Sequence, residues 1–298
     1  MGRHEVTYEV AGPWSLERSR EFWQEMAPVP PVGAAGRGGT LRTVFHADAD
    51  WRRVTAEVGQ QEAGRSGSAA RIVVTGDGDL DAAADQVARF LSLDVDARDW
   101  PAVGDRDPVI GRIQARRPGL RPCGFHSPYE AAVWAVLTQR TGRTAARGTL
   151  ADIVARLSDD GAFPSPGRLV GLDVELPWRK SEYLRAVAAA ALDGELDGAE
   201  LRALDPAEAM RRVQRVKGLG VFAAELVVVR GAGHPDVLPT REPRLAAEIE
   251  DQYGPGRDPA AIAEDWRPFR TWAAFHLRVL RAERHESGQA RPARPRGR

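Results

Sequence analysis

Polar and apolar residues alternate in several short segments of the first ninety residues, which is typical of strands buried on one face. The segments expected to be strands are residues 6–10, 41–47, 54–60 and 71–75. The polar segment 61–68 is expected to be a hairpin loop, and residues 28–39, rich in proline and glycine, a longer loop. Helices are expected after Ser15 and after Asp79, because both residue types cap helices.

Further along the chain the strand pattern stops and the apolar spacing becomes that of helices. Capping boxes open two of these helices, at 127–130 and 205–208, each with proline at the first helical position. The predicted fold class is α+β, with an N-terminal antiparallel sheet domain and its helices over residues 1–93 and an all-α domain over 94–285. A basic tail, 286–298, is expected to be disordered.

The helical part is organised around two glycines, Gly218 and Gly220, which bracket Leu219 between two helical patterns. The second pattern, 221–229, is apolar on most sides and is expected to be buried. Glycines at such a turn leave backbone N–H groups uncovered, and the start of the second helix attracts anions. The segment predicts either a helix-hairpin-helix clamp for DNA phosphates or an ordinary helical corner capped by glycine.

The composition limits the function classes. Lys and Arg together number 42, as do Asp and Glu, so DNA binding would need a local basic patch and not a global field. The single cysteine, Cys123, excludes a disulfide framework, a four-cysteine zinc site and an iron–sulfur cluster within one chain. The N-terminus lacks the apolar core of a signal peptide and no apolar run approaches membrane-spanning length, so a cytoplasmic protein is expected.

Six ordered segments resemble the 3-methyladenine DNA glycosylase II family of the helix-hairpin-helix superfamily. They are residues 117–122, 128–139, 179–184, 217–224, 236–239 and 266–277. The sheet unit is also similar to that family's first domain. The resemblance implies that 94–285 is a helix-hairpin-helix glycosylase domain. It further implies a monomeric, monofunctional DNA glycosylase of base excision repair, which flips a damaged (alkylated or related) purine out of double-stranded DNA and hydrolyses its N-glycosidic bond.

The family's catalytic aspartate follows the proline of the 237–239 block, and Glu242 occupies the matching place here. A carboxylate at this position can stabilise the oxocarbenium-like sugar and orient the attacking water. The extra methylene matters, because a displacement of about 1 Å at a reacting centre can cost on the order of 10²-fold in rate. Glu242 is interpreted either as the catalytic carboxylate or as a carboxylate at a helix start near Pro243, favoured by the dipole.

The resemblance also implies a base pocket and a reaction subclass. Bifunctional members place a Schiff-base lysine where this chain has Phe222, so lyase chemistry is not expected. Leu226 and Arg278 stand where some members have aromatic residues, and Arg278 argues against positively charged lesions if it faces the pocket. The residues expected in the base pocket are Gln139, Trp134, Phe222, Leu226, Trp272 and Arg278.

DNA contacts are expected from the hairpin and from one helix end. The residues concerned are Gln214, Lys217, Gly218, Leu219, Gly220, Val221, Ala223 and Arg140. Arg140 stands where the family presents the side chain that fills the gap left by the flipped base. The backbone carbonyls of Gln214, Lys217 and Leu219 could hold a monovalent cation; no other cofactor and no metal site are expected.

Two other functions fit the same sequence. The first is a catalytically weak or inactive protein of the same fold that binds DNA and senses lesions. The second is a structural helical interaction module, in which the hairpin is incidental. The glycosylase and the sensor both predict DNA binding that weakens with salt, and they differ in whether the charge of Glu242 is needed.

Overall fold

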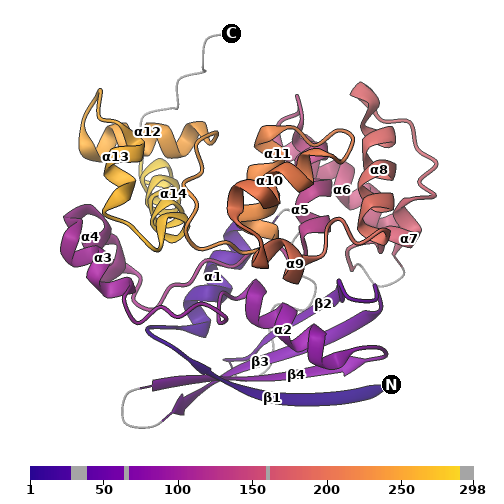
Figure 1. The fold of residues 1–298 in the computed structure, drawn as a ribbon, viewed down its shortest axis with the longest axis horizontal. Helices are drawn as coiled ribbons and strands as arrows, with labels where there is room; N and C mark the ends of the chain where they lie inside the picture. Colours follow the sequence, from indigo (N-terminus) through magenta and orange to yellow (C-terminus); the bar gives the residue numbers. More distant parts are fainter. Residues whose placement is uncertain (28–38, 64–66, 159–161, 289–298) are drawn as a thin grey trace.

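The computed structural model describes residues 1–27, 39–63, 67–158 and 162–288, so all but the last residue of the loop predicted at 28–39 lies outside it. Within these ranges one antiparallel sheet has the strand order β1-β4-β3-β2 (Figure 1). Its strands are β1 (Gly2–Val10), β2 (Leu41–His46), β3 (Arg53–Ala63) and β4 (Gly67–Gly76). Helices make up most of the remainder, and the predicted α+β class is confirmed.

The hairpin between β3 and β4 is tighter than the sequence predicts. Gln61 pairs with Ala69 and Ala63 pairs with Gly67, so the strands continue through most of the expected loop at 61–68. The side chains of Gln61 and Glu62 are exposed. A strand segment that is polar on both faces lacks the alternation by which a periodicity argument recognises strands, and this is why the prediction was wrong.

Two helices accompany the sheet, and both begin where the sequence predicts. The Ser15 side chain accepts a hydrogen bond from Arg18 N at the start of α1 (Leu16–Met26). Asp79 accepts one from Ala82 N at the start of α2 (Leu80–Phe90). The inward residues of the sheet are fully buried under these helices. Three residues from beyond position 93 also join this core: Leu120, Cys123 and Val279.

The helices after the sheet gather in two bodies, which lie side by side above it (Figure 1). One body surrounds a core of its own and comprises α3 (Trp100–Arg106), α4 (Pro108–Arg116), α12 (Pro243–Tyr253), α13 (Pro259–Glu264) and α14 (Arg270–Glu286). The other comprises α5 (Pro128–Thr138), α6 (Arg143–Leu157), α7 (Pro166–Leu169), η2 (Pro177–Arg179), α8 (Lys180–Leu192), α9 (Gly198–Ala203), α10 (Pro206–Gln214), α11 (Val221–Leu226) and η3 (Val227–Gly231).

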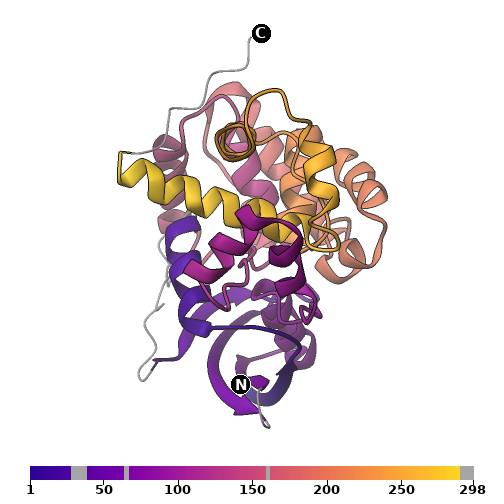
Figure 2. The ribbon, with the colours of Figure 1, turned by 90° about the vertical axis from the view of Figure 1, so that its left-hand side faces the viewer.

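The long helix α14 connects these bodies to the sheet unit. It runs across the molecule above the sheet (Figure 2), and its Phe275 ring meets Phe22 of α1 edge-on with 6.0 Å between centroids. The helix ends at Glu286, the first residue of the predicted tail, so the two overlap by one residue. Residues 289–298 of that tail lie outside the description.

The connector before α5 is held by a buried arginine. Arg121 is 0% exposed and donates hydrogen bonds to four backbone carbonyls, those of Ala11, Pro13, Ser92 and Val95. Burial lowers the pKa of its guanidinium to about 10. Because these carbonyls belong to segments on both sides of α2, Arg121 fixes the sheet unit against the start of the helical part.

Helix α5 forms the centre of its body and is buried on nearly all sides. Its predicted capping box is present in a shifted form. Ser127 accepts from Glu130 N at 3.2 Å, but the Glu130 carboxylate accepts from His126 N, one residue earlier than expected. Its Oε2 atom also lies 3.2 Å from His126 Nδ1, so the imidazole draws the carboxylate one position back.

Candidate functional site

The predicted hairpin is formed by α10, a tight turn and α11. Gly218 has φ +92°, and a Cβ added there would lie 2.4 Å from the Tyr183 ring. Gly220 begins the next helix and has no atom within 4 Å of its would-be Cβ. The turn therefore requires glycine at 218, for its backbone conformation and for the close approach of Tyr183, while position 220 is open.

Most of the second hairpin helix is buried, as the sequence predicts, but its first two residues are exposed. Val221 and Phe222 are 49% and 48% exposed, whereas Ala223 is buried. The regular helix also ends at Leu226 and continues as a π-helical segment to Gly231. The apolar residues at the start of this helix are exposed because they follow directly on the turn, at the surface of the molecule.

The other hairpin residues predicted to contact DNA are distributed around this turn. Lys217 is exposed and forms an ion pair with Glu182, while Gln214 is exposed and its amide donates to Met210 O. The side chain of Leu219 is buried beneath the turn, as is that of Ala223 on the next helix. These last two residues can present only backbone atoms to a ligand.

The end of α5 is fixed to the hairpin. Gln139 Nε2 donates to Gly218 O at 2.7 Å, so Gln139 supports the turn and does not line the cavity described below. Lys180 Nζ donates to Leu137 O at 2.7 Å and to Thr141 Oγ1, which holds the loop after α5 from the other side. Arg140, the residue predicted to fill the gap left by the flipped base, therefore lies in a loop that hydrogen bonds hold on both sides.

An exposed tryptophan beside Arg140 was missed by the sequence analysis. Trp178 is 60% exposed, and the Arg140 guanidinium carbon lies 5.3 Å from the centre of its ring. Both residues have left-handed backbone conformations, with φ of +52° at Arg140 and +63° at Trp178. Such a conformation is uncommon for residues with bulky side chains and marks a site that the fold holds in place. The sequence signal that could have identified this residue is a tryptophan in a loop, within the segment Pro177-Trp178-Arg179.

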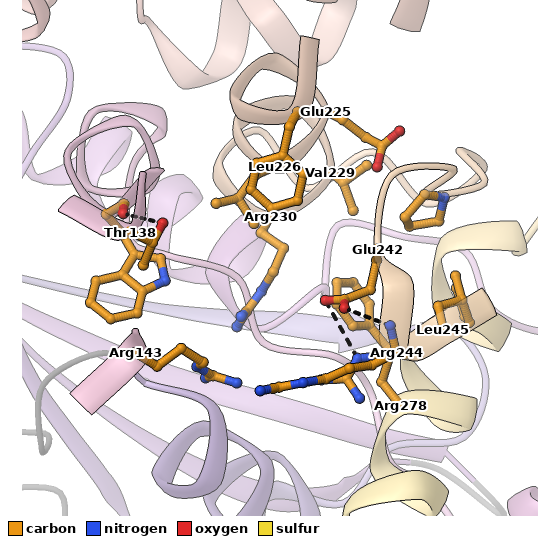
Figure 3. Close-up of a pocket in the computed structure, with 15 residues that line it drawn as sticks. Thr138, Arg143, Glu225, Leu226, Val229, Arg230, Glu242, Arg244, Leu245 and Arg278 are labelled. Carbon is orange, nitrogen blue, oxygen red and sulfur yellow. Dashed lines mark hydrogen bonds and ion pairs between the residues drawn. The ribbon is translucent and has the colours of Figure 1, made fainter. Parts of the chain in front are cut away.

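A cavity of about 230 Å³ lies between the two helical bodies (Figure 3). Its walls come from α5, α6, the second hairpin helix, the loop before α12, and α14. The lining residues are Trp134, Thr138, Arg143, Phe222, Glu225, Leu226, Val229, Arg230, Pro239, Glu242, Arg244, Leu245, Ala274, Phe275 and Arg278. The structure thus brings five predicted residues together here: Glu242, Trp134, Phe222, Leu226 and Arg278.

Trp272, which was also expected in the pocket, lies elsewhere. Its side chain is 1% exposed and packs against Trp100 and Phe269 inside the core of the α14 body. Helical spacing explains the difference, because Trp272 is six residues from Arg278 and so faces another side of α14.

Glu242 lies at a helix start, as one of the two interpretations of the sequence predicts, and it also lines the cavity. It is the N-cap of α12, where its Oε1 atom accepts from Arg244 N at 3.1 Å. Its Oε2 atom lines the cavity and lies 3.6 Å from Arg278 Nε. The backbone N–H group and the arginine hold the carboxylate at the cavity wall.

The loop that carries Glu242 is positioned by another carboxylate, which the sequence analysis did not single out. Glu225 is 7% exposed and accepts hydrogen bonds from Thr240 N, Thr240 Oγ1 and Arg241 N, at 3.0, 3.1 and 3.2 Å. Asp236 forms ion pairs with Arg267 and Arg270 and is absent from the cavity lining.

The cavity is also lined by four arginines, of which the sequence analysis identified only Arg278. Burial lowers the pKa of Arg143 and of Arg278, and brings that of Arg230 to about 10. Repulsion among the guanidiniums acts in the same direction, and Glu242 opposes it. Arg143, Arg244 and Arg278 also line an adjoining cavity of about 510 Å³, so the cationic surface extends beyond the first cavity.

The described part of the chain holds no group of three or more His, Cys, Asp or Glu side chains arranged for a metal ion. Among the same residues, no helix combines the length and apolar character needed to cross a membrane.

The chain was compared with known proteins. It is 32% identical to DNA-3-methyladenine glycosylase 2 of Escherichia coli over 185 residues, 57% of this chain and 63% of that protein. It is 25% identical to the alkylbase DNA glycosidase-like protein mag2 of Schizosaccharomyces pombe over 182 residues, 57% and 85% of the two chains. The structure of a 3-methyladenine DNA glycosylase from Archaeoglobus fulgidus superposes with a TM-score of 0.69 at 21% identity, covering 94% and 98% of the chains. No family model matches the sequence.

Proposed function

We propose that this chain, which belongs to the DNA-3-methyladenine glycosylase family of helix-hairpin-helix proteins, hydrolyses the N-glycosidic bond of a damaged purine in double-stranded DNA. The observation that carries the proposal is the position of Glu242. Its carboxylate lines a cavity of about 230 Å³, whose wall includes the second helix of the exposed hairpin. A base flipped from a duplex held at the hairpin would enter this cavity with its sugar at the rim.

The chemistry follows from the charge that develops on the sugar. As the bond between C1′ and the base nitrogen breaks, the sugar becomes an oxocarbenium-like cation, which Glu242 would stabilise while a water attacks C1′. Lyase chemistry would need an amine. The chain has only two lysines, Lys180 and Lys217, and neither lines the cavity. This supports hydrolysis without strand cleavage.

The contacts with DNA are assigned to the hairpin and the loop after α5. The first N–H groups of a helix lack intrahelical partners, so the backbone from Gly220 onward can donate to a phosphate. Arg140 would fill the gap left by the flipped base, with Trp178 beside it. We also infer a monovalent cation at the carbonyls of Gln214, Lys217 and Leu219, and a monomeric enzyme.

One observation favours a lesion sensor without activity as the second candidate. Arg278 Nε lies 3.6 Å from the Glu242 carboxylate and offsets the charge that catalysis would use. In a sensor this ion pair would only close the cavity wall.

The test is single-turnover base release from duplexes that carry alkylated, deaminated or oxidised purines. Glu242→Gln should slow release by at least about 10²-fold, the order of effect seen when one electrostatic group is lost from a reacting centre. The matched control is Glu250→Gln, an exposed carboxylate on the same helix, which should leave the rate unchanged. Equal rates for Glu242→Gln and the wild type would refute the assignment, and DNA binding without release by either would favour the sensor.

A further inference from the structure

The cavity carries an excess of positive charge. Four arginines and two glutamates line it, which leaves two positive charges unbalanced at neutral pH. The Glu225 carboxylate accepts three hydrogen bonds from the loop before α12, so its negative charge is used by that loop and not by the arginines. Glu242 is therefore the one lining carboxylate among the described residues that directly offsets the guanidiniums.

The guanidinium groups of two of these arginines have no partner among the residues that the structure describes. Within the described ranges, no hydrogen bond or ion pair involves the guanidinium of Arg143 or of Arg244. Arg230 donates to Cys123 O, but its Nε atom is buried and unpaired. The arginine side chains converge from both sides of the cavity (Figure 3). Arg143 is partly buried and Arg244 is exposed, so their donors are open to the cavity, and the buried Nε of Arg230 is the donor whose lack of a partner is costly. An acceptor-rich ligand would satisfy these donors.

The donors in this cavity outnumber the acceptors. A guanidinium offers five N–H donors and no acceptor. The Thr138 hydroxyl donates its proton to the backbone of α5, to Trp134 O or Ala135 O, so only its lone pairs face a ligand. Aromatic and apolar walls, among them Trp134 and Phe222, suit the faces of a planar ring. A matching ligand is flat and has hydrogen-bond acceptors along its edge.

These observations fit a purine whose edge carries carbonyl oxygens in place of amino groups or ring hydrogens. We propose that the cavity selects purines with added carbonyl oxygens and no positive charge, as produced by deamination or oxidation, and rejects cationic alkylated purines. This proposal deepens the glycosylase function above and rests on it. Two unbalanced charges near the base would disfavour a cation by on the order of 100-fold, even with the effective dielectric of a partly buried site.

The same arginines would assist the departure of such a base. In hydrolysis, water gives its hydroxyl to C1′ and the electrons of the C1′–N bond go to the base. A cationic base then leaves neutral, whereas an uncharged base leaves as an anion and takes the remaining proton afterwards. Donors preorganised around the base stabilise the anion that develops. An arginine-lined cavity therefore favours a leaving group that needs this help.

The first measurement is binding to duplexes that cannot be cut. Each carries a 2′-fluoroarabino nucleotide, which stabilises the glycosidic bond, with 7-methylguanine, xanthine, hypoxanthine or 8-oxoguanine as the base. Wild-type protein is expected to bind one or more of the three duplexes with a deaminated or oxidised base at least tenfold more tightly than the 7-methylguanine duplex, whose base is cationic. Xanthine and hypoxanthine represent deamination and 8-oxoguanine oxidation, so the ranking distinguishes the two sources.

Arginine variants show which residues produce the preference between bases. Arg278→Gln and Arg143→Gln should each reduce the preference for the deaminated or oxidised base over the cationic base by about tenfold, because each lowers the net charge of the lining residues from two to one. The control is Arg156→Gln, which removes an exposed arginine from the last turn of α6, outside both cavities. It should leave the preference unchanged. Circular dichroism confirms that each variant is folded, and the two substitutions are on different helices, so misfolding of one leaves the other as the test.

The outcomes separate this inference from the proposed activity. Equal or tighter binding of the 7-methylguanine duplex, or a preference unchanged in both arginine variants, overturns the inference even if the protein cuts DNA. Single-turnover release from the ordinary deoxynucleotide duplexes, corrected for spontaneous loss of 7-methylguanine, tests the activity. Selective binding without release of any base would support the selectivity and overturn the glycosylase function.

Discussion

Glu225 offers a test of how the fold positions the proposed catalytic carboxylate. It lies in the second hairpin helix, and three donors of Thr240 and Arg241 bind its two oxygens. These residues directly precede Glu242. We therefore propose a positioning role for Glu225, in which its hydrogen bonds fix the loop that carries Glu242 to the hairpin helix.

The expected loss of stability follows from the number of hydrogen-bond donors that lose their acceptor when Glu225 is replaced. In Glu225→Gln the amide oxygen can keep the two bonds to Thr240, but the amino group then faces the N–H of Arg241. One partly buried donor is left unpaired, at a cost of about 1 kcal/mol in the free energy of unfolding. Glu225→Ala removes all three bonds, and we expect roughly 3 kcal/mol once water from the cavity replaces part of them.

The decisive assay is the single-turnover rate, measured well below the unfolding temperature. If the loop moves by about 1 Å, release should slow by on the order of 10²-fold in Glu225→Gln, because the reacting geometry is that sensitive. Thermal unfolding provides the stability change, and Glu250→Gln is the control for loss of a carboxylate from the surface. A variant that is less stable but releases base within twofold of the wild-type rate would refute the positioning role.

Three further predictions concern the DNA-facing turn and the core. Gly218→Ala should weaken duplex binding by at least about tenfold, since its φ is +92° and the new Cβ would meet the Tyr183 ring. Gly167→Ala, at an exposed glycine outside the hairpin with open space around its would-be Cβ, should bind normally, and fluorescence anisotropy compares the two variants. Trp178→Ala should remove the stacking partner of a splayed base and lower duplex affinity by about 1–3 kcal/mol. Loss of stacking should appear as weaker quenching of a 2-aminopurine in the duplex, while the thermal stability of the protein stays unchanged. Burial lowers the pKa of His276 to about 4, against about 6.5 when unfolded, so the unfolded chain binds the extra proton between these values. The contribution of His276 to the free energy of unfolding is complete above pH 6.5, and about 3 kcal/mol of it is lost as the pH falls toward 4. A His276→Gln variant should lack that part of the pH dependence when stability is measured by urea unfolding.

Local rules predicted much of the fold because they act within a few residues. Ser15 and Asp79 cap helices whatever the rest of the chain does, and the alternation at 54–60 identifies a strand buried on one face. The misses occurred where a distant partner decides the outcome. His126 moves the capping contact of Glu130 by one residue, and the strands at 61–63 and 67–69 are recognisable only by their mutual pairing.

Residues of the candidate site could be predicted only where they belong to a sequence motif. Glu242 and the hairpin glycines could be located because their neighbours in the sequence identify them. The arginine cluster could not, since Arg143 begins α6, Arg230 ends the hairpin helix and Arg278 lies in the middle of α14. Each alone resembles a solvated charge, and only the meeting of the two helical bodies brings them around one cavity. The family pattern therefore predicts the type of reaction, whereas under the selectivity proposed above the choice of base depends on this tertiary arrangement. Arg278 stands where some members of the family have an aromatic residue, so a change at one wall of the cavity would alter the substrate while Glu242 keeps a carboxylate at the matching position.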